Sequence, residues 1–123
     1  IENAAVRGTQ LKARLEAIAG RSAIIGDVRG LGLLLAMELT CDKANKTPIP
    51  LELVAPVRFQ AIASAFGLAV SCRRTSQGAY GDWLMISPPL TVTEAEVDEI
   101  AVGLEKALAA YERELRGQGV LKG

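Results

Sequence analysis

The chain has 123 residues and half of them are apolar, which is enough for one buried core but too little for two ordinary domains. Its 14 basic and 14 acidic side chains cancel, so it lacks the positive field that attracts nucleic acid or an anionic membrane surface. It has no histidine, which removes the commonest general base and the imidazole metal ligands. We therefore expect one compact unit with no nucleic-acid and no membrane partner.

The two cysteines, Cys41 and Cys72, are widely separated and form no CxxC pair, so the sequence predicts no metal site. We interpret both as reduced thiols and expect a cytoplasmic protein. The longest apolar run, Leu31 to Met37, is far shorter than the roughly 20 residues of a membrane-spanning helix. No secretory signal is visible. The chain begins with Ile1 and opens directly on a helical pattern, which indicates a fragment, although tag removal or processing would give the same start.

The first third of the chain predicts a helix followed by two strands. Residues 4–19 carry apolar side chains at helical spacing between charged ones, and Gly20 is expected to end this helix in the left-handed conformation. Residues 24–29 and 31–39 are predicted strands, and the glycines at their junction favour a tight hairpin. The polar, proline-containing segment 41–50 predicts a surface loop.

The middle of the chain predicts a second helix and two further strands. Residues 55–66 form the helix, with Pro56 acceptable in its first turn. Residues 68–71 are a predicted short strand, 72–81 a polar loop and 83–86 another strand. The prolines that follow stop the sheet, because they cannot donate to a ladder.

The last helix begins at a capping box, Thr93 with Glu96, and is expected to run to about Arg116. The expected order is therefore helix, two strands, helix, two strands, helix. This order predicts the α+β class, as a small sandwich of a mainly antiparallel sheet with helices packed on one face.

Three charged or glycine-rich groups are better explained by structure than by chemistry. Residues 29–32, Arg-Gly-Leu-Gly, lack the third glycine and the following helix of a dinucleotide fingerprint, so a hairpin is favoured. Lys43 and Lys46 lie in a polar loop, where solvated lysines are favoured over a lysine that forms a Schiff base. The acidic residues of 94–99 open a helix, where negative charge is favourable.

Arg73 and Arg74 are the candidate site residues. They are adjacent guanidinium groups on a predicted loop, with no obvious acidic partner nearby in the sequence. One interpretation is a pair of solvated loop charges, and the other is an anion-binding contact.

An ordered set of motifs resembles the carboxy-terminal segment of class III aminotransferases. It consists of Ile25-Gly-Asp-Val-Arg-Gly-Leu-Gly-Leu33, then Glu38-Leu39, then Ser87-Pro-Pro-Leu-Thr-Val-Thr-Glu94. The resemblance extends from about Asn3 to Leu108, and within the family it is closest to the branch that uses ω-amino acids or amines as donors.

The resemblance implies that residues 1–123 are the C-terminal small domain of a longer, homodimeric enzyme of the fold-type I architecture. A large domain would supply the Schiff-base lysine, the acid at the pyridine nitrogen and the phosphate cup for pyridoxal phosphate. Those motifs are absent here, so the resemblance implies a scaffold with no catalytic, covalent cofactor-binding or metal residues. Some relatives carry a carboxylate-binding arginine where this chain has Ser71, so that role is expected to have moved to Arg73 or Arg74.

The function expected is thus that of a domain of a pyridoxal-phosphate aminotransferase, which transfers an amino group from an amine or amino acid to a keto acid. The alternative is a free-standing α+β binding or interaction module without transaminase activity. A self-contained enzyme that uses carboxylates is disfavoured, because no paired acids fall on facing loops or strand ends.

Overall fold

A computed structural model describes residues 2–68, 70–74 and 82–121 of the chain. Its elements follow the expected order, with one additional short 3-10 helix, η1. They are α1 (Glu2–Arg21), β1 (Ile25–Leu31), β2 (Leu34–Leu39), η1 (Leu51–Leu53), α2 (Ala55–Ala65), β3 (Ser71–Arg74), β4 (Asp82–Ile86) and α3 (Glu94–Gly117).

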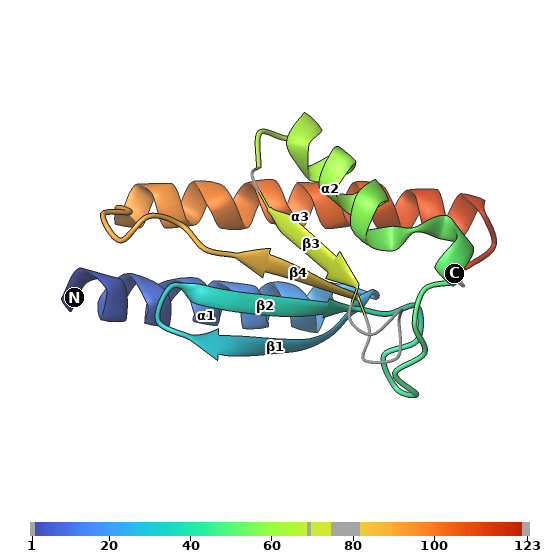
Figure 1. Ribbon diagram of the computed structural model, residues 1–123, viewed down its shortest axis with the longest axis horizontal. Helices are drawn as coiled ribbons and strands as arrows, with labels where there is room; N and C mark the ends of the chain where they lie inside the picture. The colour runs from blue at the N-terminus through green and yellow to red at the C-terminus, as the bar shows by residue number, and fades with distance from the viewer. Residues whose placement is uncertain (1, 69, 75–81, 122–123) are drawn as a thin grey trace.

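The four strands form one antiparallel sheet in the order β1-β2-β4-β3. Figure 1 shows α1 and α3 side by side behind this sheet, and α2 packs on α3 and on the β3 end of the sheet. The predicted α+β class, with an antiparallel sheet and helices on one face, is confirmed.

The core lies between the sheet and the helices, and the strands supply it with every second residue. Burial alternates strictly along β2 and β4, as expected for a sheet with one covered face. The helices contribute apolar side chains at helical spacing, and the Phe59 ring of α2 lies 5.9 Å from the Tyr111 ring of α3. The buried members of this core include Leu11, Leu15, Leu35, Met37, Leu39, Phe59, Leu84, Val97, Leu104 and Tyr111.

Helix α1 meets the turn of the β1–β2 hairpin at Gly8. A Cβ built on Gly8 would lie 2.3 Å from the carbonyl oxygen of Gly32, so only glycine allows this approach. Gly32 has a φ of 56°, which the first central position of the favoured two-residue hairpin turns requires. Lys12 of α1 adds a hydrogen bond from Nζ to the carbonyl oxygen of Gly30, at 3.2 Å. The predicted tight hairpin is therefore confirmed.

The end of α1 differs from the prediction. Gly20 lies inside the helix, which ends at Arg21, and Gly20 is not among the glycines with positive φ. The terminal carbonyls are bound instead by Lys43, whose Nζ donates to the oxygens of Ala19 at 2.7 Å and Ser22 at 2.9 Å. The interpretation of Lys43 as a solvated lysine was thus wrong, because its half-buried ammonium caps α1.

The third strand begins later than predicted. The predicted strand 68–71 starts only at Ser71, because Leu68 belongs to the C-terminal cap of α2. Its amide donates to the carbonyl of Ala63 at 2.9 Å, and Gly67 has a φ of 78°. This is the hydrogen bond of a Schellman motif, a common way to end a helix. The predicted loop 72–81 starts correspondingly later, and its residues 75–81 lie outside the described part of the chain.

The predicted capping box of α3 is confirmed. The Thr93 hydroxyl accepts from the Glu96 amide at 3.1 Å, and the Glu96 carboxylate accepts from the Thr93 amide at 3.0 Å. Glu94 and Glu96 lie in the first turn of α3, where the helix dipole favours negative charge. Asp98 pairs with Arg14 of α1. These acidic residues therefore stabilise the start of α3 and its contact with α1.

Candidate functional site at the end of strands β3 and β4

Both candidate arginines lie on the β3–β4 ladder. The backbone of Arg73 pairs with Trp83 and that of Arg74 with Asp82. The expectation that they occupy a loop was therefore wrong, because β3 extends through Arg74 to match the start of β4. Their side chains lie outside the described part of the structure.

A buried carboxylate stands where β4 begins. Asp82 is 1% exposed and pairs with Leu39 of β2 on one side and Arg74 of β3 on the other. A buried carboxyl group needs polar partners, because its transfer from water is costly. Asp82 thus lies buried at the end of the sheet at which the backbones of both arginines lie.

Cys72 precedes the arginines on β3, and its thiol has low reactivity. Burial, and then the negative charge of Asp82, raise the pKa of its thiol to about 12. At neutral pH the group is a thiol and not the nucleophilic thiolate. The Cys72 amide donates to the Gln60 side chain at 3.3 Å, which ties β3 to α2.

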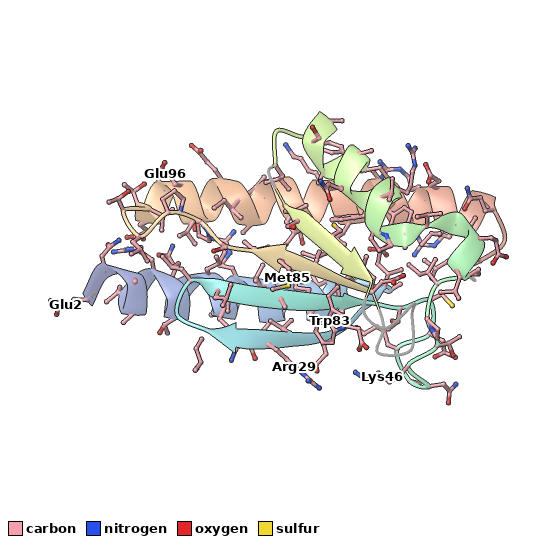
Figure 2. All side chains as sticks on the ribbon, in the orientation of Figure 1. Glu2, Arg29, Lys46, Trp83, Met85 and Glu96 are labelled. Atoms are coloured by element: carbon pink, nitrogen blue, oxygen red, sulfur yellow. The ribbon has the colours of Figure 1, made fainter. Side chains whose placement is uncertain are left out.

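A charged and aromatic cluster lies on the face of the sheet that is turned away from Asp82 and Leu84. The Arg29 guanidinium lies 5.5 Å from the centre of the Trp83 ring, and its Nε donates to Asp27 Oδ2 at 2.7 Å. Lys46 Nζ donates to the carbonyl of Gly26 at 2.6 Å and lies 3.4 Å from the carboxylate of Glu38. Figure 2 shows Arg29, Trp83 and Met85 on the side of the sheet turned away from α1 and α3.

The Asp27 carboxylate is held ionised by this cluster. Burial, the largest single influence, raises its pKa, but the opposing influences together lower the pKa below the usual range. These are the hydrogen bonds from Arg29 and from the Val28 amide, followed by the charges of Arg29 and Lys46. Sequence reasoning missed this cluster, although the two-residue spacing of Asp27 and Arg29 places both on one face of a strand.

The lysines described do not form a site for pyridoxal phosphate. Such a site needs a lysine with a lowered pKa beside the cofactor ring. Here Lys12, Lys43 and Lys46 donate to backbone carbonyls, and Lys106 is exposed on α3. The residues described in 2–68, 70–74 and 82–121 therefore do not fit the covalent cofactor site that this reaction class uses.

We also considered whether a surface pocket could be a site for a reaction of another class. One of about 560 Å³ is lined by Cys41, Lys43, Val120 and Leu121 among others. Its lysine is bound to carbonyl oxygens, and burial followed by the charge of Asp42 raises the pKa of Cys41. Among the described residues no group of three histidine, cysteine or acidic side chains could hold a metal ion. None of the helices described is long and apolar enough to cross a membrane.

Comparison with known proteins gives the same family at every level. A family model described as "Aminotransferase class-III" matches residues 1–108. A taurine–pyruvate aminotransferase of Bilophila wadsworthia is 35% identical over 113 residues, which are 92% of this chain and 24% of the relative. A diaminobutyrate–2-oxoglutarate aminotransferase of Rhizobium meliloti is 31% identical over 118 residues, 92% of this chain and 23% of the relative.

The fold also matches solved enzymes. The crystal structure of an (S)-enantioselective omega-transaminase from Thermomicrobium roseum superposes with a TM-score of 0.77 and 34% identity, over 89% of this chain and 22% of that one. The chain thus spans about a quarter of the length of the proteins it matches.

Proposed function

Because the chain belongs to the class III aminotransferase family, which depends on pyridoxal phosphate, we propose that it is the C-terminal small domain of a longer aminotransferase. The intact enzyme transfers an amino group from an amine or amino acid to a keto acid. The observation that carries the proposal is the family match over residues 1–108, within a chain that spans about a quarter of its relatives.

In this proposal the described residues are a scaffold, and the cofactor is held by the large domain. The lysine contacts support this division, because the amines of Lys12, Lys43 and Lys46 are already engaged by carbonyl oxygens. We extend the proposal to a homodimeric, cytoplasmic enzyme. The family resemblance supports the homodimer, and the free thiols of Cys41 and Cys72 support a reducing compartment.

The test is to incubate the purified 123-residue chain with pyridoxal phosphate, reduce with borohydride and locate any labelled lysine by mass spectrometry. We expect no stoichiometric label and no turnover of an amine with pyruvate. Stoichiometric labelling of one lysine, together with turnover, would contradict the proposal.

The longer polypeptide provides the positive arm of the test. Expressed with the sequence that precedes Ile1 in its reading frame, the chain should transaminate. A start codon shortly before Ile1, with no cofactor-lysine segment upstream, would favour the free-standing interaction module instead.

We also propose that Arg73 or Arg74 contacts the substrate carboxylate in the intact enzyme. Their backbones lie at the end of the β3–β4 ladder, two and three residues after Ser71, the position at which some relatives carry a carboxylate-binding arginine. A guanidinium can hold a carboxylate through two parallel hydrogen bonds, and a charge-assisted bond contributes about 1.5–3 kcal/mol.

The experiment compares two donors in the intact enzyme, one that bears a carboxylate and a matched amine that lacks it. Replacing the responsible arginine by alanine should lower kcat/KM about 10- to 150-fold for the acid only. Arg113→Ala, an exposed arginine of α3, is the control. Equal losses for both donors, or no loss in either variant, would make these arginines ordinary surface charges.

A further inference from the structure

One face of the sheet is not covered by any helix of the described part of the chain, and apolar side chains lie on it. Helices α1 and α3 lie behind the sheet (Figure 1) and α2 packs at its β3 end, so alternate residues of β1, β2 and β4 point away from the core. The cross-strand pairs Leu31 with Leu34, Arg29 with Ala36, and Ala36 with Met85 place these residues on one surface. We call this surface the open face, and its apolar members are Leu31, Leu34, Ala36, Trp83 and Met85.

The open face exposes more apolar surface than single scattered side chains would. Leu31 is 87% exposed and Leu34 is 60% exposed at the hairpin end. Trp83 and Met85 continue the surface across β4, and both side chains are half-buried. Contiguous apolar surface of this kind marks an interaction site more often than isolated exposed residues do.

The charged side chains that the structure describes on the open face compensate one another. Arg29 pairs with Asp27 at 2.7 Å and also lies over Trp83. Lys46 pairs with Glu38 at 3.4 Å. Among these described side chains, a partner that covers the face therefore removes water from paired charges. The pattern, an aromatic and methionine centre with a charged rim, is that of a protein interface.

We infer that the open face is the surface on which the large domain of the same aminotransferase packs. The inference rests on the proposed function, and its occupant is the polypeptide that makes up the other three-quarters of the relatives. On the proposed function, a segment of that length adjoins this domain. The open face is suited to this contact because it presents apolar side chains and paired charges. The outer faces of α1 and α3 are less suited, because they carry the ion pairs of Arg14 and Arg21.

The two methionines of the chain provide a footprinting experiment. Met85 lies on the open face and Met37 is 0% exposed in the core. Hydroxyl radicals oxidise side chains according to their exposure. In the isolated chain, at a concentration where it is monomeric, Met85 should react much faster than Met37. In the full-length enzyme Met85 should be protected about tenfold, whereas Phe66, exposed on the helical side, should react equally in both.

A charge on the open face should then weaken docking. Leu34→Glu in the full-length enzyme should speed proteolysis between the domains about tenfold or more, as loss of an interface anchor does. Val57→Glu is the matched control, because Val57 is 67% exposed but lies on α2. Met37 in the isolated Leu34→Glu chain should stay unreactive, which separates lost docking from unfolding.

Several outcomes would overturn the inference. Met85 as reactive in the full-length enzyme as in the isolated chain would do so, as would Leu34→Glu behaving like Val57→Glu. Protection of Met85 only when two copies of the isolated chain associate would assign the face to a second copy instead. Failure of the proposed function looks different, because the unmodified full-length protein would then not transaminate, whatever the state of Met85.

Discussion

At Gly8 no side chain fits between α1 and the β1–β2 turn. A Cβ there would lie 2.3 Å from the carbonyl oxygen of Gly32, and backbone cannot move aside as a flexible side chain can. Gly20 lies in the same helix but has no heavy atom within 4 Å of its Cβ position. The same substitution should therefore have opposite effects at the two ends of α1.

We expect Gly8→Ala to lower the free energy of unfolding by about 1–3 kcal/mol, the usual cost of overpacking. Gly20→Ala should raise it by about 0.5–1 kcal/mol, because alanine loses less backbone entropy in a helix. Urea unfolding followed by circular dichroism measures both. If Gly8→Ala is as stable as Gly20→Ala, the close approach of α1 to the turn is wrong.

The ion pair between Arg58 of α2 and Glu114 of α3 makes stability depend on pH. Arg58 Nε lies 2.8 Å from Glu114 Oε2 and 3.1 Å from Oε1, and this hydrogen bond lowers the pKa of Glu114 against the opposing effect of burial. A carboxyl whose pKa is lower in the folded state stabilises that state above its ordinary value, 4.5. This contribution is lost as the pH falls through the lower, folded-state pKa.

A double-mutant cycle on Arg58→Ala and Glu114→Ala should give a favourable coupling energy at pH 7 that disappears as the pH falls well below 4.5. Thermal melts of the four proteins across this range measure it. Because the Arg58 side chain is 51% exposed and the Glu114 side chain 26% exposed, solvent screens the pair and we expect a small coupling. A coupling that persists unchanged in acid would show that the two side chains interact by packing and not by charge.

Among the elements, those with strong local signals matched their predictions. The capping box of Thr93 and Glu96 predicted the start of α3, and Gly67 predicted the end of α2. The errors came from contacts between distant residues. Gly20 does not end α1, because Lys43 caps it from a later loop.

The third strand illustrates the same limit. Leu68 and Val70 have strand-like side chains, but the cap of α2 engages the Leu68 amide. Leu68 then packs where a Cβ on Gly103 of α3 would lie 3.1 Å from its Cδ2. The strand starts only where pairing with β4 begins, at Ser71. A local pattern contains no information on this pairing, and so the arginines were expected on a loop.

Removing the cap of α3 should cost stability without altering the fold. Thr93→Ala leaves the Glu96 amide without its side-chain acceptor, and we expect a loss of about 1 kcal/mol. Thr91→Ala is the control, because Thr91 is exposed and precedes the capping box. Chemical denaturation measures the free energy of unfolding of both variants. Equal values would show that the cap makes no measurable contribution to stability.

At the scale of the whole molecule, the sequence predicted the family and the two-layer architecture, but not the functional surfaces. Ordered motifs such as Ser87-Pro-Pro can be recognised in a single chain, because their identity and order are local properties of the sequence. The cluster of Arg29 with Trp83 joins residues from opposite parts of the chain, and it forms only when β1, β2 and β4 come together in the sheet. The open face is likewise a property of the assembled sheet.

The open face also predicts how the isolated chain behaves in solution. With Leu31 and Leu34 largely exposed beside Trp83 and Met85, two copies can lower their exposed apolar area by meeting at this face. We therefore expect sedimentation coefficients that rise with concentration, and binding of a hydrophobic dye. Leu34→Glu should reduce both, whereas Val57→Glu, at a comparable exposure on α2, should reduce neither. If the chain sediments as a monomer over a wide concentration range and binds no dye, the open face does not promote self-association. The apolar character assigned to it from the register of β1, β2 and β4 would then have no consequence for association.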